Sequence, residues 1–367
     1  MAGDVLQDIL DIARANGATP EHVRALLTTW LAGGELSLDV RGFPPSKRLI
    51  AALPQLRAVF DARARVRTEH PSADGSMRLL IELADGATVE SVLLARGGLC
   101  ISTQVGCAVG CVFCKTGEGG LVRQLSGVEM LAQVALARAR ADVRRVVLMG
   151  MGEPAHNLES VLAALRVLGA EGRLAHKHLV FSTVGDRAAF EALHGHGVRP
   201  ALALSLHTTK SELRRELLPR APRIEPRELL ELALAYADAT TWPLQVQWTL
   251  LAGLNDGDDE LEALATWLAG RRAMVNFIPW NQVDGMSFAR PGEERGREMV
   301  RFLRARGVIA TLRRSGGQDV EGACGQLRAR ELPLRRRANA APQPVEDPRV
   351  GARVETRGEI SAPRSTT

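Results

Sequence analysis

Cysteine is rare in this chain and unevenly distributed. Four of the five cysteines fall in one stretch, CISTQVGCAVGCVFC. Cys107, Cys111 and Cys114 form a C-x3-C-x2-C motif, Cys100 precedes it, and Cys324 lies far downstream. Three thiolates are one fewer than a structural zinc site or a fully coordinated four-iron cluster requires. A four-iron cluster held by these three cysteines would have one iron open to a small molecule.

The cysteine motif also has two alternative interpretations, zinc binding and chance clustering. A zinc ion would need a distant fourth ligand, because no histidine follows at zinc-finger spacing. Inert buried thiols could also cluster by chance, although cysteine is scarce elsewhere in the chain. A disulfide framework is not expected, because the sequence shows neither a signal peptide nor a run of about 18 apolar residues. These features predict a cytoplasmic protein without a membrane span, in which thiols stay reduced.

Small polar or charged side chains follow several short apolar segments. Glycine permits close approach of a ligand to the backbone, and a carboxylate can hold an ammonium group. The acidic residue could instead be a helix N-terminal charge, and the others could be helix caps. Several such residues at successive strand ends favour a binding site, and they are Gly152 and Glu153 after RRVVLMG, Ser182 in KHLVFS, Ser205 and His207 in RPALALSLH, and Asn281 after AMVNFIPW.

A β-then-α rhythm positions these residues. From about residue 125, short apolar runs alternate with amphipathic stretches such as GVEMLAQVALARARA. About six such units without a GxGxxG turn favour a parallel (β/α) barrel, partial or full, over a doubly wound sheet. We therefore predict an α/β fold in which residues 100–327 form the barrel domain.

Different patterns flank the barrel segment. Residues 1–70 show helical spacing with glycine stops, which predicts a small helical domain. Residues 71–99 predict a β-hairpin with a turn at Asp85-Gly86, which puts Glu90 on its second strand. Residues 328–367 have no periodicity and predict a basic, disordered tail.

The charge balance permits a nucleic-acid partner without requiring one. The formal net charge is +5, from 47 Lys and Arg against 42 Asp and Glu. Basic runs could track phosphates or simply be solvated faces. With one tyrosine and eight phenylalanines, the sequence offers little support for an aromatic stacking surface.

The motifs together resemble those of radical S-adenosylmethionine (SAM) enzymes. Within that superfamily, the chain is most similar to the adenine C2 methyltransferases of ribosomal and transfer RNA. A related resistance enzyme, which methylates adenine at C8, shares much of the pattern. The resemblance covers roughly residues 75–330 and rests on motifs in the same order, namely CISTQVGC, MGMGEP, FSTVG, SLH, NFIPWNQ and GACGQL.

This resemblance implies cofactors and the residues that bind them. Cys107, Cys111 and Cys114 would bind the [4Fe-4S] cluster, whose open iron is chelated by the amino and carboxylate groups of SAM. The implied SAM-binding residues are Gly152, Glu153, Ser182, Ser205, Leu206, His207 and Asn281.

The same resemblance assigns the two remaining cysteines to catalysis. Cys324 would take a methyl group from one SAM, and a second SAM would supply the radical that activates it for addition to the adenine. Cys100 would resolve the RNA-protein adduct through a transient disulfide with Cys324. Glu90 would be the proton acceptor, with Cys100 as the rival base. The alternatives for these residues are an exposed strand glutamate and an inert thiol.

The target position and the partners follow less directly. IPWN resembles the C2 branch, whereas ATLRRSGGQDVEGACGQL and NQVDGMSF depart from its usual pattern. We expect methylation of an adenine carbon of RNA, with C2 as the preferred position and 23S ribosomal RNA preferred over transfer RNA. The expected electron donor is flavodoxin or ferredoxin, and the expected oligomeric state is a monomer. The alternatives are adenine C8 methylation, another radical-SAM reaction such as glycyl-radical activation, and a non-catalytic RNA-binding relative.

Overall fold

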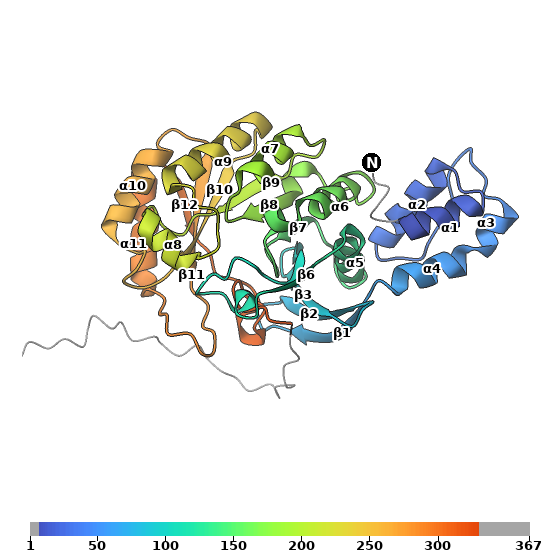
Figure 1. Ribbon diagram of the computed structural model, residues 1–367, viewed down its shortest axis with the longest axis horizontal. Coiled ribbons are helices and arrows are strands. Elements are labelled where there is room, and N and C mark those ends of the chain that lie inside the picture. Colours follow the sequence, from blue (N-terminus) through green and yellow to red (C-terminus); the bar gives the residue numbers. More distant parts are fainter. Residues whose placement is uncertain (1–6, 330–367) are drawn as a thin grey trace, which may run out of the picture.

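A helical module opens the structure, a computed structural model in which residues 7–329 are described (Figure 1). Thr19 caps α2, and Trp30 of that helix stacks on Phe60 with 4.3 Å between ring centroids. Arg138 of α5 donates a hydrogen bond to the carbonyl of Leu31, which joins the module to the rest of the chain. The helices are α1 (Gln7–Ala15), α2 (Pro20–Leu31), α3 (Lys47–Ala51) and α4 (Leu53–Asp61).

An antiparallel segment follows the helices. β2 (Met77–Leu83) pairs with β3 (Thr88–Leu94), as the hairpin pattern predicts, and β3 pairs with β4 (Gly98–Cys100). The expectation that residues 1–70 are helical is wrong at its end, because β1 (Ala64–Pro71) is a strand paired with β2. The segment ARVRTEHP has few apolar residues, so its strand structure depends on pairing with β2 more than on a hydrophobic pattern of its own.

Within the described residues, ten strands form one sheet in the order β1-β2-β3-β4-β7-β8-β9-β10-β11-β12. From β4 onward, neighbouring strands are parallel. These later strands are β7 (Arg145–Leu148), β8 (Leu179–Thr183), β9 (Ala201–Ser205), β10 (Leu244–Leu250), β11 (Ala273–Pro279) and β12 (Ile309–Leu312). No ladder in the described part joins β1 to β12, so the predicted barrel is a partial one.

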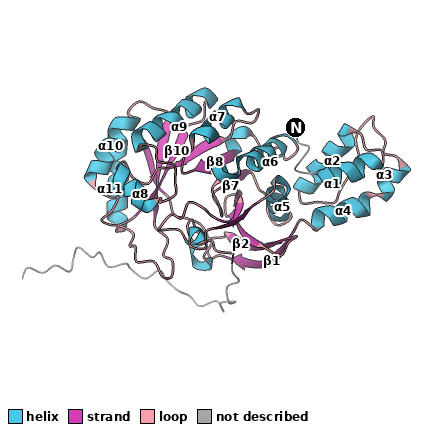
Figure 2. Cartoon of the chain, in the orientation of Figure 1, coloured by secondary structure: helices cyan, strands magenta, loops and turns pink. Residues whose placement is uncertain are grey.

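Helices cover the outer side of the parallel strands (Figure 2). They are α5 (Gly127–Arg138), α6 (Leu158–Ala170), α7 (Arg187–Gly195), α9 (Pro226–Thr240), α10 (Asp258–Leu268) and α11 (Glu293–Ala305). A further helix, α8 (Ser211–Leu217), packs its Leu217 against Cys107 and Phe113 instead. The short elements are β5 (Gln104–Gly106), β6 (Leu121–Gln124), and the 3-10 turns η1 (Lys115–Gly117), η2 (Pro154–Asn157), η3 (His176–His178) and η4 (Gln318–Val320).

The two faces of the parallel strands differ in polarity. Side chains such as Phe181, Trp248 and Phe277 join the main hydrophobic core together with residues of the covering helices. Because side chains alternate along a strand, their neighbours Ser182, Gln247 and Asn276 lie on the opposite, concave face. The concave face is therefore where polar chemistry can occur.

A C-terminal segment, residues 313–329, runs from β12 back to the antiparallel strands. The carboxylate of Asp319 accepts hydrogen bonds from Ser72 and from the backbone N–H of Ala73, and the N–H of Gly317 donates to Asp74. This segment carries Cys324. Residues 328–329 belong to it rather than to the predicted tail, whose remaining residues, 330–367, lie outside the described part of the chain.

Candidate active site

The predicted cluster ligands lie on one loop between β5 and β6. Cys107 is buried, Cys111 and Cys114 are partly buried, and all are free thiols. Loss of water raises the pKa of each thiol, to about 11 for Cys107, and the pKa of Cys111 is raised further by its two partners. Proximity to one another in a water-poor environment suits thiols that are deprotonated by binding iron.

Hydrogen bonds from distant elements hold this loop in place. The backbone N–H of Val112 donates to the carbonyl of Leu217 at the end of α8, over 3.1 Å. The indole of Trp280 donates to the carbonyl of Phe113 over 3.1 Å. The N–H of Lys115 donates to the C-terminal segment over 2.7 Å. The loop is thus fixed on several sides without using its thiols.

The residues around the thiols fit a [4Fe-4S] cluster. The loop belongs to a small apolar core with Val184, Leu217, Leu251 and Trp280, which excludes water from the sulfur atoms. Among residues 7–329, no three His, Cys, Asp or Glu side chains are grouped around a single metal ion. That finding does not support the zinc alternative, because zinc ligands must converge on one ion. A [4Fe-4S] cluster does not need such convergence, because each thiolate binds a separate iron atom.

Gly152 and Glu153 follow β7 on the same side as the loop. Gly152 has a φ of 107°, and a Cβ there would lie 2.7 Å from the side chain of Gln104. The Glu153 carboxylate accepts hydrogen bonds from the N–H of Ala155 at 3.0 Å and of Val184 at 2.9 Å. The first contact is the helix-capping alternative realised in η2. Burial raises the pKa of Glu153, despite hydrogen bonds that lower it.

The next two strands place three of the predicted SAM-binding residues. Ser182 in β8 is buried, and Ser205 at the end of β9 is partly buried on the concave face. Leu206 directly follows β9, is fully buried, and belongs to the main core. Only the backbone of Leu206 can therefore contact a ligand.

His207 turns the chain at the end of this strand. It has a φ of 65°, and its Nδ1 accepts the N–H of Thr249 over 2.9 Å. Its ring packs edge-on against Phe113 at 5.0 Å between centroids. Burial lowers the pKa of His207 to about 3, so the imidazole is neutral and carries its proton on Nε2.

Arg214 on α8 stabilises the turn at His207. Its guanidinium donates to the carbonyls of Ser205 at 3.0 Å, Leu206 at 2.5 Å and Val184. Burial lowers the pKa of Arg214 to about 10, opposed by the charges of Cys111 and Glu153. Sequence reasoning missed this residue, because an arginine on an amphipathic helix looks like an exposed charge.

Asn281 connects β11 to the segment that carries Cys324. Its Nδ2 donates to the hydroxyl of Ser315 at 3.0 Å and to the carbonyl of Cys324 at 2.9 Å. Its Oδ1 is buried and has no hydrogen-bond partner within the described chain. Asn281 thus supports the Cys324 loop and retains one acceptor for a ligand.

The two cysteines outside the motif face the same region. Cys324 is exposed, whereas Cys100 is 8% exposed, and both are free thiols. Burial raises the pKa of Cys100, and the charge of Cys324 adds to that shift and to the shift of Cys114. The tertiary structure therefore brings Cys324 within electrostatic reach of Cys100 and of the predicted cluster loop.

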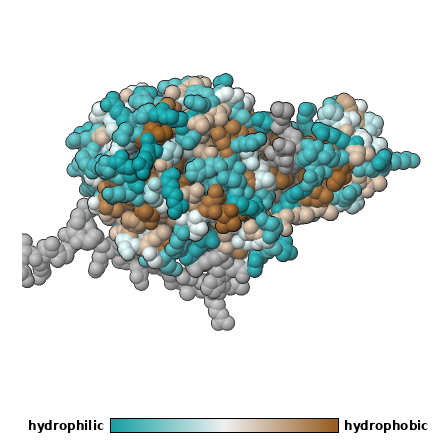
Figure 3. Space-filling view, in the orientation of Figure 1, coloured by the Kyte–Doolittle hydropathy of each residue, from teal (hydrophilic) through white to brown (hydrophobic). Residues whose placement is uncertain are grey.

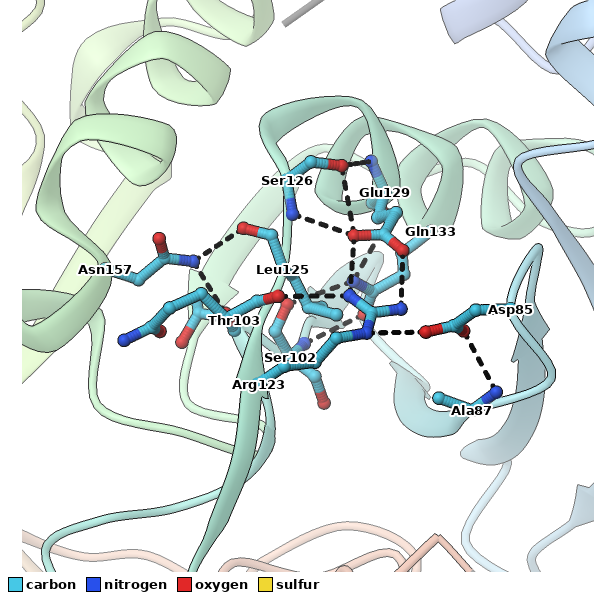
Figure 4. A network of polar contacts seen from close by, with 11 residues as sticks. Asp85, Ala87, Ser102, Thr103, Arg123, Leu125, Ser126, Glu129, Gln133 and Asn157 are labelled. Atoms are coloured by element: carbon cyan, nitrogen blue, oxygen red, sulfur yellow. Dashed lines mark hydrogen bonds and ion pairs between the residues drawn. The ribbon is translucent and has the colours of Figure 1, made fainter.

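A polar network fixes the chain after Cys100 (Figure 4). Gln133 on α5 accepts the N–H of Ser102 and donates to its carbonyl, each over 2.9 Å. The Ser102 hydroxyl donates to the carbonyl of Glu90 over 2.6 Å. Nearby, Arg123 on β6 bridges Glu129 and the hairpin turn at Asp85. The network ties β3, β4, β6 and α5 together at the entrance to the cluster loop.

Glu90 is placed differently from an exposed strand residue. It is fully buried, and it accepts hydrogen bonds from Arg78, at 2.9 Å from Nε, and from the backbone N–H of Arg328 at 3.1 Å. Desolvation raises the pKa of Glu90, and the ion pair with Arg78 opposes that rise. Sequence reasoning missed Arg78, although a single arginine within an otherwise apolar strand could have indicated a buried ion pair.

The surface beside the cluster loop is mixed in character. Figure 3 shows brown apolar patches within a largely hydrophilic surface. Val112 on the loop and Leu121 and Val122 on β6 are exposed, the last by 73%. Among the described helices, none has the length and apolarity to cross a membrane.

Comparison with known proteins agrees with this geometry. Residues 101–268 match the family model described as the Radical SAM superfamily. A probable RNA methyltransferase of Methylibium petroleiphilum is 56% identical over 328 residues, covering 89% of this chain and 93% of that protein. One of Aromatoleum aromaticum is 57% identical over 341 residues, covering 90% and 95%.

A solved structure supports the same placement. The crystal structure of a radical SAM methyltransferase from Sphaerobacter thermophilus has a TM-score of 0.77 and 33% identity, covering 90% of this chain and 99% of that one. Enzymes of this superfamily carry a [4Fe-4S] cluster and use SAM, which the cysteine motif and its apolar surroundings can accommodate. The chain therefore belongs to the radical SAM superfamily, within its group of probable RNA methyltransferases.

Proposed function

We propose that the protein methylates an adenine carbon in RNA, with C2 as the preferred position and 23S ribosomal RNA as the preferred substrate. Transfer RNA is a further candidate substrate. The observation that carries this proposal is the position of Cys324, which is exposed yet within electrostatic reach of Cys100 and Cys114. The names of the relatives support RNA as the substrate.

An S-methylcysteine intermediate explains why an exposed thiol lies beside a cluster loop. Adenine C2 and C8 are poor nucleophiles, so direct displacement of a methyl group from SAM does not methylate them. A [4Fe-4S] cluster held by Cys107, Cys111 and Cys114 would supply the electron that makes radical chemistry with SAM possible. Cys324 accepts a methyl group at Sγ from one SAM and presents it to the base, and a second SAM is consumed in activating that group.

Cys100 resolves the product from the protein. Once the methylene carbon is bonded to adenine, the ring proton goes to the base and the unpaired electron of the adduct would return to the cluster. Cys100 gives up its thiol proton as it attacks Sγ of Cys324. The S–S bond forms as the S–C bond breaks, the electron pair goes to the departing carbon, which takes a proton to complete the methyl group, and external reductant restores both thiols. The free thiols of the structure correspond to the reduced state of this pair.

Glu90 and Cys100 are the two candidate proton acceptors. The raised pKa of Cys100 keeps its thiol protonated at neutral pH, which favours Glu90. Glu90 is held by Arg78 and by the N–H of Arg328, so it also has a structural role. We therefore assign proton acceptance to Glu90, an assignment that replacement by glutamine tests.

The proposed SAM site combines the strand-end residues. Gly152 forms the turn before Glu153, where a Cβ would meet Gln104 and Thr103, and Glu153 receives the ammonium group beside the cluster thiols. Ser182, Ser205, the Leu206 backbone, His207 and Asn281 line the remainder. The free Oδ1 of Asn281 supports its place in this set.

The remaining partners follow from the reaction. A low-potential donor such as flavodoxin or ferredoxin would reduce the cluster, and the chain would act as a cytoplasmic monomer. The apolar side chains of Val112, Leu121 and Val122 beside the cluster loop offer such a donor, or the RNA, a contact surface.

The decisive experiment is RNA methylation by anaerobically reconstituted protein. Protein, SAM and a reductant are incubated with unmodified 23S ribosomal or transfer RNA, and nucleosides are identified by mass spectrometry. We expect 2-methyladenosine with the native protein and none with Cys324→Ala. The 8-methyl isomer would overturn the C2 assignment, and 5'-deoxyadenosine without methylated RNA would overturn the RNA substrate.

A further inference from the structure

The concave face of the sheet carries a polar row beyond the residues assigned so far. Parallel pairing puts Gln247 of β10 opposite Asn276 of β11, and Asn276 opposite Thr311 of β12. Ser205, at the end of β9, lies opposite Gln247. The row therefore lies at the same level as Ser205 and continues the proposed SAM site across three more strands.

Two amides in this row are buried without partners. Gln247 is 4% exposed and Asn276 is 1% exposed. Within the described residues, neither Oε1 nor Nε2 of Gln247 has a hydrogen-bond partner, and Nδ2 of Asn276 has none. The Thr311 hydroxyl donates to Oδ1 of Asn276 over 2.9 Å, which leaves Nδ2 as the available donor. Buried amides are normally satisfied, so these atoms indicate a ligand that completes them.

We propose that Gln247 and Asn276 bind the adenine base of SAM. The primary amide of Gln247 offers a donor beside an acceptor, which matches the amino group and neighbouring ring nitrogen of adenine. The Asn276 Nδ2 supplies a third hydrogen bond to a ring nitrogen. The inference rests on the proposed SAM site, since it extends that site to the base.

The position of the polar row relative to the cluster loop supports its assignment to the adenine end of SAM rather than to the methionine end. The charge of Glu153 acts on Cys107 and Cys111, so the methionine end belongs on the β7 side, beside the open iron. The adenosyl end must then extend along the concave face. Deeper on β8 and β9 that face carries Val180, Ala201 and Ala203, whose side chains offer no hydrogen bond to a base, whereas the Gln247 amide does.

A binding experiment separates this role from activity. Cluster-loaded protein is titrated calorimetrically with S-adenosylhomocysteine and with S-inosylhomocysteine, whose base carries an oxygen in place of the amino group. We expect native protein to prefer the adenosyl ligand by roughly tenfold to a hundredfold. Gln247→Met should lose most of that preference, and Asn276→Leu should lower the affinity for both ligands. The control Gln245→Met, two residues earlier on the same face, should behave like native protein.

Thermal unfolding of the apo protein guards against misfolding. Gln247→Met removes an unpartnered buried amide, so its melting temperature should equal or exceed the native value while adenosyl binding falls. Unchanged affinity and preference in Gln247→Met would overturn the proposal and leave an internal water as the partner. The proposal would also be wrong if Gln247→Met weakened the binding of an RNA fragment but left the binding of the adenosyl ligand unchanged. Gln247 would then contact the target adenine of the RNA. Failure of the proposed function would appear separately, as normal ligand preference without methylated RNA.

Discussion

Arg78 and Glu90 form an ion pair that is closed to solvent, with side-chain exposures of 1% and 0%. Both flank the segment that carries Cys324, because Arg78 donates to the carbonyl of Val320 over 3.4 Å and Glu90 accepts the N–H of Arg328. The pair thus fixes the Cys324 segment against β2 and β3, beside the strand that ends at Cys100.

Removing the cation of this pair should destabilise the protein strongly. Arg78→Met leaves a buried carboxylate without its partner, so we expect a loss of about 3–5 kcal/mol in unfolding free energy. The matched control is Arg65→Met, which breaks the pair between Glu82 and a 75% exposed arginine side chain. That control should cost about 1 kcal/mol or less. Urea unfolding measures both, and equal losses would contradict a buried-pair role.

The same variant should show a pH dependence of known sign. Burial raises the pKa of Glu90 and Arg78 opposes that rise, so in Arg78→Met the folded-state pKa should be higher still. A raised folded-state pKa stabilises below the unfolded pKa, and that stability is lost as pH rises through the folded value. The destabilisation by Arg78→Met should therefore grow as the pH rises from below the unfolded-state pKa of glutamate through the raised folded-state pKa. A difference from native protein that does not change with pH would argue that Glu90 is neutral in both.

Glu90→Gln tests proton acceptance. The amide oxygen can still accept from Arg78, but the NH2 group that replaces the second oxygen cannot accept the N–H of Arg328, and the side chain can no longer take a proton. We expect the RNA-protein adduct to accumulate and methylated RNA to fall at least about tenfold, in the range of lost general-base catalysis. Denaturing gel electrophoresis with labelled RNA detects the adduct. Native turnover in this variant would transfer the role to Cys100.

Cysteine substitutions should separate cluster binding from methyl transfer. Cys107→Ala should lose the iron and the visible absorbance of reconstituted protein, because two thiolates remain. Cys324→Ala should keep the iron and the visible absorbance and still cleave SAM, because Cys324 is exposed and lies outside the loop. Iron content and 5'-deoxyadenosine are the measurements. Loss of iron in Cys324→Ala would mean that Cys324 is a ligand.

Gly152→Ala should damage the SAM site through sterics. A Cβ there would lie 2.7 Å from Gln104 and 2.8 Å from Thr103 Oγ1, so overpacking should cost about 1–3 kcal/mol and weaken ligand binding. Gly86→Ala is the control, because φ is +83° but nothing lies within 4 Å. Calorimetric titration with S-adenosylhomocysteine should show weaker binding only for Gly152→Ala, and equal binding would remove Gly152 from the site.

The parallel strands were predictable because their signal is local. Each of β7 to β12 is a short apolar run that an amphipathic helix separates from the next, and alternation along it sets which side chains face the helices. β1 was not predictable in the same way, since its polar sequence becomes a strand only by pairing with β2.

By itself, the sequence determined the chemistry that was available: three clustered cysteines, polar strand ends, and two further cysteines far apart in the chain. Only the tertiary structure decided which of these groups meet. It returned the C-terminal segment to the antiparallel strands, which brought Cys324 near Cys100 and buried Glu90 against Arg78. The physical reason is that burial and electrostatic reach depend on packing between segments hundreds of residues apart, which no local pattern encodes.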